Sequence, residues 1–106
     1  MKSDLLKIIN NYGVRHQLKK LNEEVFELIE AIRDYEEQKQ ACENIGCSRI
    51  HTDKCKEHIE EEFADVMVML GQFQHYYNID EKNVRRIMSE KADRQIERII
   101  NENNNI

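Results

Sequence analysis

Two acidic clusters are the part of this chain best suited to chemistry. The first, EEVFE, spans residues 23–27, and the second, EFAD, spans residues 62–65. Each cluster places two carboxylates three residues apart, which brings them side by side on one face of a helix. Four carboxylates on two packed helices repel one another unless a cation neutralises them. An all-oxygen site favours a hard divalent ion such as Mg²⁺, with Mn²⁺ as a substitute. The clusters therefore predict metal-dependent phosphate chemistry.

The composition predicts the kind of fold that would position these clusters. The chain has 106 residues, no proline, three glycines and many good helix formers, which indicates a single all-α domain over residues 1–106. A domain of this size has a modest core, and oligomerisation commonly adds to its stability. We expect a four-helix-type bundle in which helices also pack between subunits, as a homodimer or homotetramer.

Hydrophobic spacing predicts helices over residues 3–11, 15–39, 54–77 and 81–101. Ser3 and Asp80 are the expected N-caps, and Gly13 is expected to break the first two helices apart. Residues 40–53 lose the pattern and are predicted to be a connection or insertion, and residues 101–106 a frayed tail. The predicted apolar seams are Leu18, Leu21, Val25, Leu28, Ile32 and Tyr35 on the second helix, and Ile59, Phe63, Val66, Leu70, Phe73 and Tyr77 on the third.

A polar stripe is predicted to run beside the seam of the second helix, at Gln17, Lys20, Glu24 and Glu27. Gln17 lies two turns before Glu24 on this stripe and is a candidate substrate-binding residue. The third helix carries apolar residues on more than one side, which favours a subunit interface in addition to an internal core. On the fourth helix, cations replace apolar residues along one angular sector.

The order of these motifs resembles a known family. Glu-Glu-x-x-Glu on one helix, followed by Glu-x-x-Asp on the next, is similar to the all-α nucleoside triphosphate pyrophosphohydrolases of the MazG-like group. The downstream segment KADRQ, residues 91–95, resembles the basic element that family members use against phosphates. The resemblance covers residues 13–99, and the connection between the two acidic motifs is longer than in compact members.

The resemblance implies a metal site and a reaction. The implied metal ligands are Glu24, Glu27, Glu62 and Asp65. Glu23 is the leading acid of the first motif and would act with Glu24 and Glu27 in catalysis, as a ligand, a hydrogen-bonding group or an aid to water activation. The implied phosphate contacts are Lys91 and Arg94. The implied reaction is attack of water on the α-phosphorus of a nucleoside triphosphate, which gives a monophosphate and pyrophosphate.

Two other classes of function compete with this hypothesis. Acidic pairs on a charged helix are usually a solvated face, so the chain could be a non-catalytic helical-bundle interaction module. A metal-bound regulatory partner that has lost catalysis is a further alternative. Cations on the apolar sector of the last helix favour the enzyme, because a scaffold gains nothing from burying them.

Cysteine and histidine residues between the acidic motifs raise a separate question. Their soft ligands suit Zn²⁺, but their spacing does not follow a well-known zinc-finger pattern, so unpaired thiols remain the alternative. The set is Cys42, Cys47, His51, Cys55 and His58.

Charge and hydropathy exclude several partners. The net charge of −5 argues against binding to a nucleic-acid polymer, which needs a basic face. No apolar stretch approaches the roughly 20 residues that span a membrane, and the first residues lack a signal-peptide pattern. An odd number of cysteines without a secretory signal fits a reducing compartment. We therefore expect a cytoplasmic protein.

Overall fold

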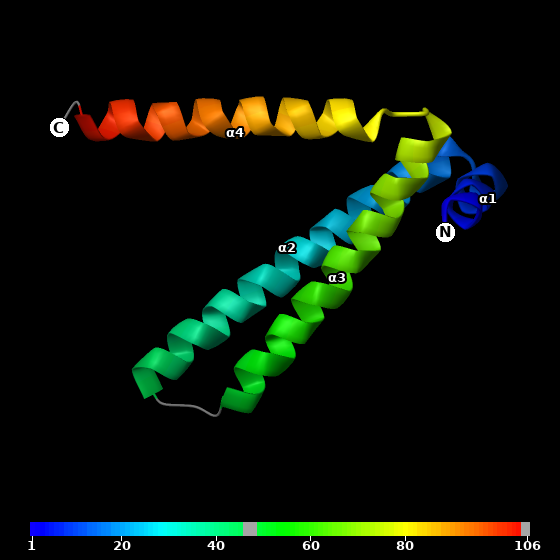
Figure 1. Cartoon of the computed structure of the whole chain (residues 1–106). Helices are drawn as coiled ribbons and strands as arrows, with labels where there is room; N and C mark the ends of the chain where they lie inside the picture. Colours follow the sequence, from blue (N-terminus) through cyan, green and yellow to red (C-terminus); the bar gives the residue numbers. More distant parts are fainter. Residues whose placement is uncertain (46–48, 105–106) are drawn as a thin grey trace. The chain divides into compact units, whose positions relative to one another are not determined.

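The computed structural model describes residues 1–45 and 49–104, and the side chains of residues 1–44 and 53–104. Within these residues the chain forms four helices and no strand, namely α1 (Lys2–Tyr12), α2 (Val14–Ile45), α3 (Arg49–Tyr76) and α4 (Glu81–Asn104) (Figure 1). The prediction of an all-α protein is confirmed. The chain divides into two compact units, Met1–Tyr76 and Tyr77–Ile106, and each is described by itself.

Of the three residues predicted to cap or break helices, two are confirmed and one is wrong. Gly13 separates α1 from α2 with a φ of 89°, a conformation that glycine adopts without a steric penalty. Asp80 caps α4, because its Oδ1 accepts a hydrogen bond from the Lys82 N–H at 3.0 Å. Ser3, however, is already inside α1. Met1 holds the N-cap position, and its carbonyl oxygen accepts the first helical hydrogen bonds from Asp4 and Leu5 at 3.1 Å.

The predicted connection over residues 40–53 is largely helical. α2 continues to Ile45 and α3 begins at Arg49, while residues 46–48 lie outside the described chain. A segment without apolar periodicity has no face that predicts packing against a neighbour. Residues such as Gln, Lys, Ala and Glu still favour a helix there. At the other end, α3 stops at Tyr76, before Asn78 with its left-handed φ of 51°. α4 extends to Asn104, into the predicted tail.

The first unit is built around the pairing of α2 with α3, and α1 packs against both. In Figure 1, α2 and α3 lie side by side as an antiparallel hairpin. The buried apolar side chains of the first unit are Leu5, Ile9, Ala31, Val66 and Met69. α1 approaches α3 closely at Gly71, where an added Cβ would lie 3.0 Å from Cδ1 of Leu5. Because Gly71 has no side chain, α1 can pack close to α3 at this position.

The buried seam of α2 is displaced from the predicted one. Gln17, Glu24 and Ala31 are buried, whereas the predicted seam residues Leu18 and Ile32 are 51% and 43% exposed. Each residue turns a helix by 100°, so a shift of one position moves a side chain from the packing face to its edge. The prediction was wrong here because periodicity locates an apolar arc but not the edge of that arc that meets the neighbouring helix.

On α3 the predicted seam is right at Val66, which is buried, and is displaced by one position elsewhere. Met69 is buried, while Phe63 and Leu70 of the predicted seam are exposed. Because α2 and α3 are antiparallel, side chains that follow the buried positions in either helix lie on the same side of the hairpin. We call this surface the outer apolar face. Its exposed residues are Leu18, Ile29, Ile32, Phe63, Met67 and Leu70.

Candidate metal centre

Three carboxylates from the two paired helices converge on one point. Glu24 comes from α2, and Glu62 and Asp65 come from one turn of α3; one carboxylate oxygen of each lies within 4.8 Å of the others. Glu24 is buried, with 7% of its surface exposed, and the side chain of Glu62 is 13% exposed. Asp65 is exposed and borders the cluster toward solvent. The structure therefore brings together three of the four predicted metal ligands.

Two oxygens of this cluster are buried without a hydrogen-bond partner. They are Oε2 of Glu24 and Oε2 of Glu62. A buried carboxylate oxygen that gives up water without a replacement partner is unfavourable by several kcal/mol. A hard divalent cation held between Glu24, Glu62 and Asp65 would supply the missing interaction through ligands that Mg²⁺ and Mn²⁺ prefer. The donor set fits such an ion.

Glu27, the fourth predicted ligand, lies at the edge of the cluster. The charge of Glu24 raises the pKa of Glu27 above its ordinary value of 4.5, and desolvation and the charge of Glu62 act in the same direction. Glu27 is exposed and is not one of the three converging carboxylates. The charges of Glu24 and Glu62 thus act on Glu27, and its part as a metal ligand stays a prediction.

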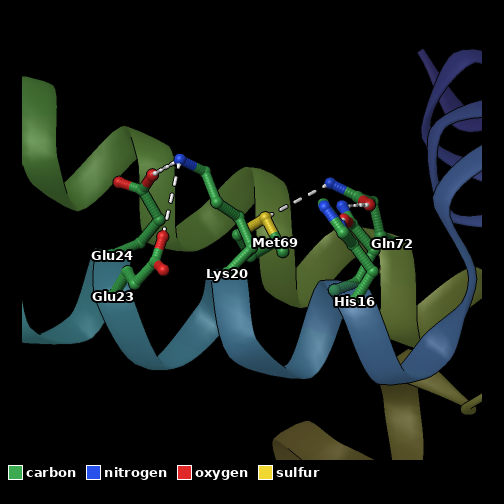
Figure 2. A network of polar contacts seen from close by, with 7 residues as sticks. His16, Lys20, Glu23, Glu24, Met69 and Gln72 are labelled. Carbon is green, nitrogen blue, oxygen red and sulfur yellow. Dashed lines mark hydrogen bonds and ion pairs between the residues drawn. The ribbon is translucent and has the colours of Figure 1, made fainter.

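Glu23, predicted to assist catalysis, faces solvent beside the cluster. Its side chain is 65% exposed, and its Oε2 lies 4.0 Å from Nζ of Lys20. The same ammonium lies 3.1 Å from Oε1 of Glu24 (Figure 2). The hydrogen bond with Glu24 and the charge of that carboxylate raise the pKa of Lys20. Sequence reasoning placed Lys20 on the polar stripe without giving it a role, although its spacing of four residues from Glu24 indicated the contact.

A second cationic candidate approaches the cluster from α3. Nε2 of His58 lies 3.8 Å from Oε1 of Glu62, and Nδ1 lies 3.8 Å from Oε2 of Glu61. His58 is half exposed. This side chain therefore borders the carboxylates from the solvent side.

A pocket of about 530 Å³ adjoins the cluster and is formed by α1, α2 and α3. Lys20 and Glu23 line it at the end next to the carboxylates, and Tyr12 and His16 line it near the break between α1 and α2. The rings of Tyr12 and His16 stack with centroids 4.9 Å apart. Flat rings and a neighbouring polar edge are suited to an aromatic ligand.

Buried amides form the polar edge of this pocket. Nε2 of Gln17 donates a hydrogen bond to Oε1 of Gln72 at 2.8 Å, and Nδ1 of His16 lies 2.7 Å from Oε1 of Gln17. Gln72 in turn donates to the sulfur of Met69 at 3.5 Å. Figure 2 shows Gln72 and Met69 reaching from α3 toward the α2 residues. Gln17, a predicted substrate-binding residue, thus lies in a pocket beside the acidic cluster, and Gln72 is a pocket residue that spacing alone did not identify.

Lys91 and Arg94, the predicted phosphate contacts, lie on α4 in the second unit. Together with Gln95 and Arg98 they line a small hollow of about 170 Å³. Clustering of these cations along one side of α4 agrees with the predicted angular sector. Their role toward the acidic cluster stays a prediction, because each unit is described by itself.

The zinc hypothesis is wrong at Cys42, which is disulfide-bonded and so offers no thiolate to a metal. Cys55 is a half-buried free thiol, and His58 lies beside Glu61 and Glu62. Cys47 and the side chain of His51 lie outside the described residues. Among the side chains that the structure describes, the group able to hold a metal is the acidic cluster.

Comparisons with models of protein families, with curated proteins and with solved structures return no match. Within the described ranges, no helix combines the length and apolar character needed to cross a membrane. Function is therefore inferred from the geometry of the cluster and its pocket.

Proposed function

We propose that this chain is a divalent-metal-dependent nucleoside triphosphate pyrophosphohydrolase of the MazG-like type, which forms a nucleoside monophosphate and pyrophosphate. One observation supports this most strongly. Glu24 and Glu62 hold two buried carboxylate oxygens that have no partner, and these residues converge with Asp65. A scaffold has no use for such an arrangement, because a buried carboxylate oxygen without a partner lowers the stability of the fold.

The side chains have distinct parts in the proposed reaction. A cation held by Glu24, Glu62, Asp65 and Glu27 would polarise phosphoryl oxygens and favour ionisation of water. Glu24 and Glu62 are fixed by burial and so define where the phosphates lie. The exposed Glu23 carboxylate is positioned at the solvent edge of the pocket, where its Oε2 can accept a proton from the attacking water.

The pocket beside the cluster would bind the nucleoside. The stacked rings of Tyr12 and His16 offer a flat apolar surface, and the amides of Gln17 and Gln72 offer hydrogen-bonding groups for a base edge. Lys91 and Arg94 would neutralise the departing pyrophosphate, as cations do in other phosphoryl transfers. A free nucleotide pool in the cytoplasm is the proposed source of substrate.

A second copy of the chain is the proposed occupant of the outer apolar face. A two-fold interface buries the same patch on both subunits, so one continuous apolar surface is sufficient to form it. The outer apolar face includes side chains from both helices of the hairpin, and on α3 each lies one position after the seam. Packing there leaves the carboxylates, on the other side of the seam, accessible to substrate.

The alternative is a non-catalytic interaction module. The ion pair between Lys20 and Glu24 favours it to some extent, because a lysine can neutralise part of an acidic face without a metal. The partnerless Oε2 atoms of Glu24 and Glu62 argue against it.

A product analysis tests the proposal. The chain is incubated with a panel of ribo- and deoxynucleoside triphosphates in ¹⁸O-labelled water, with Mg²⁺ or with chelator. We expect monophosphate and pyrophosphate only with Mg²⁺, and ¹⁸O only in the monophosphate, because the α-phosphorus is attacked. Label in pyrophosphate or in inorganic phosphate would assign a different bond. Absence of hydrolysis together with absence of metal binding would favour the interaction module.

A further inference from the structure

Lys20 joins the acidic cluster to the pocket. Its Nζ lies 3.1 Å from Oε1 of Glu24 and 4.0 Å from Oε2 of Glu23, and its side chain is 47% exposed and lines the pocket. Figure 2 shows the side chain reaching from α2 toward both carboxylates. Lys20 thus pairs with Glu24, the most deeply buried carboxylate of the cluster.

The two oxygens of the Glu24 carboxylate have different surroundings. Oε1 is paired with Lys20, whereas Oε2 is buried without a partner. A divalent cation bound to Glu24 would lie within a few ångströms of the ammonium, and like charges at that distance repel each other strongly in a partly buried site. The ammonium and a metal ion therefore compete for the same carboxylate.

We propose that Lys20 is the internal counter-ion of the metal-free site and becomes a phosphate-binding residue when metal displaces it from Glu24. This inference rests on the proposed function, since it requires a metal and a phosphorylated ligand. The lysine stem is flexible and its ammonium carries three donors, so it can exchange one carboxylate for a non-bridging phosphate oxygen. The exchange makes binding of metal and phosphate mutually favourable.

An ordinary surface ion pair would not have this effect. Pairs of exposed charges four residues apart on a helix contribute a few tenths of a kcal/mol and are screened by salt. Glu24, in contrast, is 7% exposed and lies within 4.8 Å of two more carboxylates. Removal of the lysine leaves that group without its neighbouring ammonium and strengthens its attraction for a metal.

The test measures binding by calorimetry rather than activity. Mn²⁺ is titrated into the metal-free protein, and inorganic tripolyphosphate is titrated in the presence of saturating Mg²⁺. Lys20→Met is compared with Lys20→Arg and with the matched control Lys39→Met, an exposed lysine about 28 Å further along the same helix. Lys20→Met should tighten Mn²⁺ binding about fivefold and weaken tripolyphosphate binding about tenfold. Lys20→Arg should retain most of the phosphate affinity, and Lys39→Met should change neither.

The possible results separate the two proposals. If Lys20→Met weakens Mn²⁺ binding or leaves it unchanged, Lys20 does not compete with the metal and the inference is overturned. The same holds if tripolyphosphate binds equally well without the lysine. If the unaltered chain binds Mn²⁺ through Glu24, such results leave the proposed function intact. If it binds no Mn²⁺ at all, both proposals fail.

Discussion

The two sides of the α2–α3 hairpin differ in an informative way. One side gathers carboxylates around a partly buried cluster, and the other exposes large apolar residues such as Phe63 and Met67. Asp65 and Met67 flank the buried Val66 and point about 100° to either side of it. A chain selected only for stability as a monomer would bury the apolar residues and expose the acids. This reversal underlies two proposals, a divalent cation at the acidic side and a second copy of the chain at the apolar side.

The largest expected effect comes from removing the charge of a buried ligand. Glu62→Gln should lower pyrophosphate release about a thousandfold, because the cation loses a fixed carboxylate while the side-chain volume is retained. Steady-state kinetics at saturating Mg²⁺ measure the loss. Glu37→Gln is the control, since Glu37 is exposed on α2. Equal activity in both variants would show that the carboxylate of Glu62 takes no part in the reaction and would contradict the proposed metal site.

The opposite side is tested by placing a charge on the outer apolar face. Met67→Glu should weaken self-association at least about a hundredfold, since an apolar contact worth roughly 2 kcal/mol is lost and a carboxylate is desolvated in its place. Sedimentation velocity over a range of concentrations measures the shift. Gln38→Glu adds the same charge elsewhere on an exposed site and should leave association unchanged. A chain that is already monomeric without substitution would contradict the proposed use of this face.

Thermal unfolding with and without Mg²⁺ also tests the carboxylate side, and the expected effect is smaller than in the two preceding experiments. At a Mg²⁺ concentration one hundred times the dissociation constant, the free energy of unfolding should rise by about 2.7 kcal/mol. Glu24→Gln should abolish that rise. It should also stabilise the metal-free protein by about 1 kcal/mol, because repulsion from Glu62 and Asp65 is relieved and the charge beside the partnerless Oε2 is removed. A metal-free Glu24→Gln protein less stable than the unaltered chain would show that Glu24 is satisfied without metal.

The smallest expected effect is a pH dependence caused by Glu27. Its pKa is raised in the folded protein, chiefly by the charge of Glu24. The metal-free folded state therefore holds this proton more tightly than the unfolded chain does. The contribution of Glu27 to stability is fully present below the ordinary pKa of 4.5 and is lost as the pH rises through the higher folded value.

Urea unfolding in chelator between pH 4 and pH 7.5 measures this dependence as a difference between two proteins. Glu27→Gln should become progressively more stable relative to the unaltered chain as the pH rises, since the glutamine cannot ionise. A constant difference across that range would indicate that Glu27 does not sense the charges of Glu24 and Glu62.

The sequence predicted the helices and the acidic motifs because both depend on local spacing. Gly13 and Asp80 act through the backbone of their own turn, so their roles as break and cap followed from residue type. Glu24 could be paired with Glu27, and Glu62 with Asp65, because residues three apart share a helix face. Ser3 was misassigned because a polar residue can occupy the first turn of a helix without capping it.

Only the tertiary structure decided which edge of each apolar arc is buried. Leu18 and Gln17 are adjacent in sequence, and either could have met α3. The register of the hairpin buries Gln17, whose Nε2 donates a hydrogen bond to Oε1 of Gln72 at 2.8 Å. That choice turns Glu24 inward toward Glu62 and Asp65 and leaves two carboxylate oxygens without partners. Local periodicity carries no information about register between helices, whereas a contact between Glu24 and Glu62 depends entirely on it.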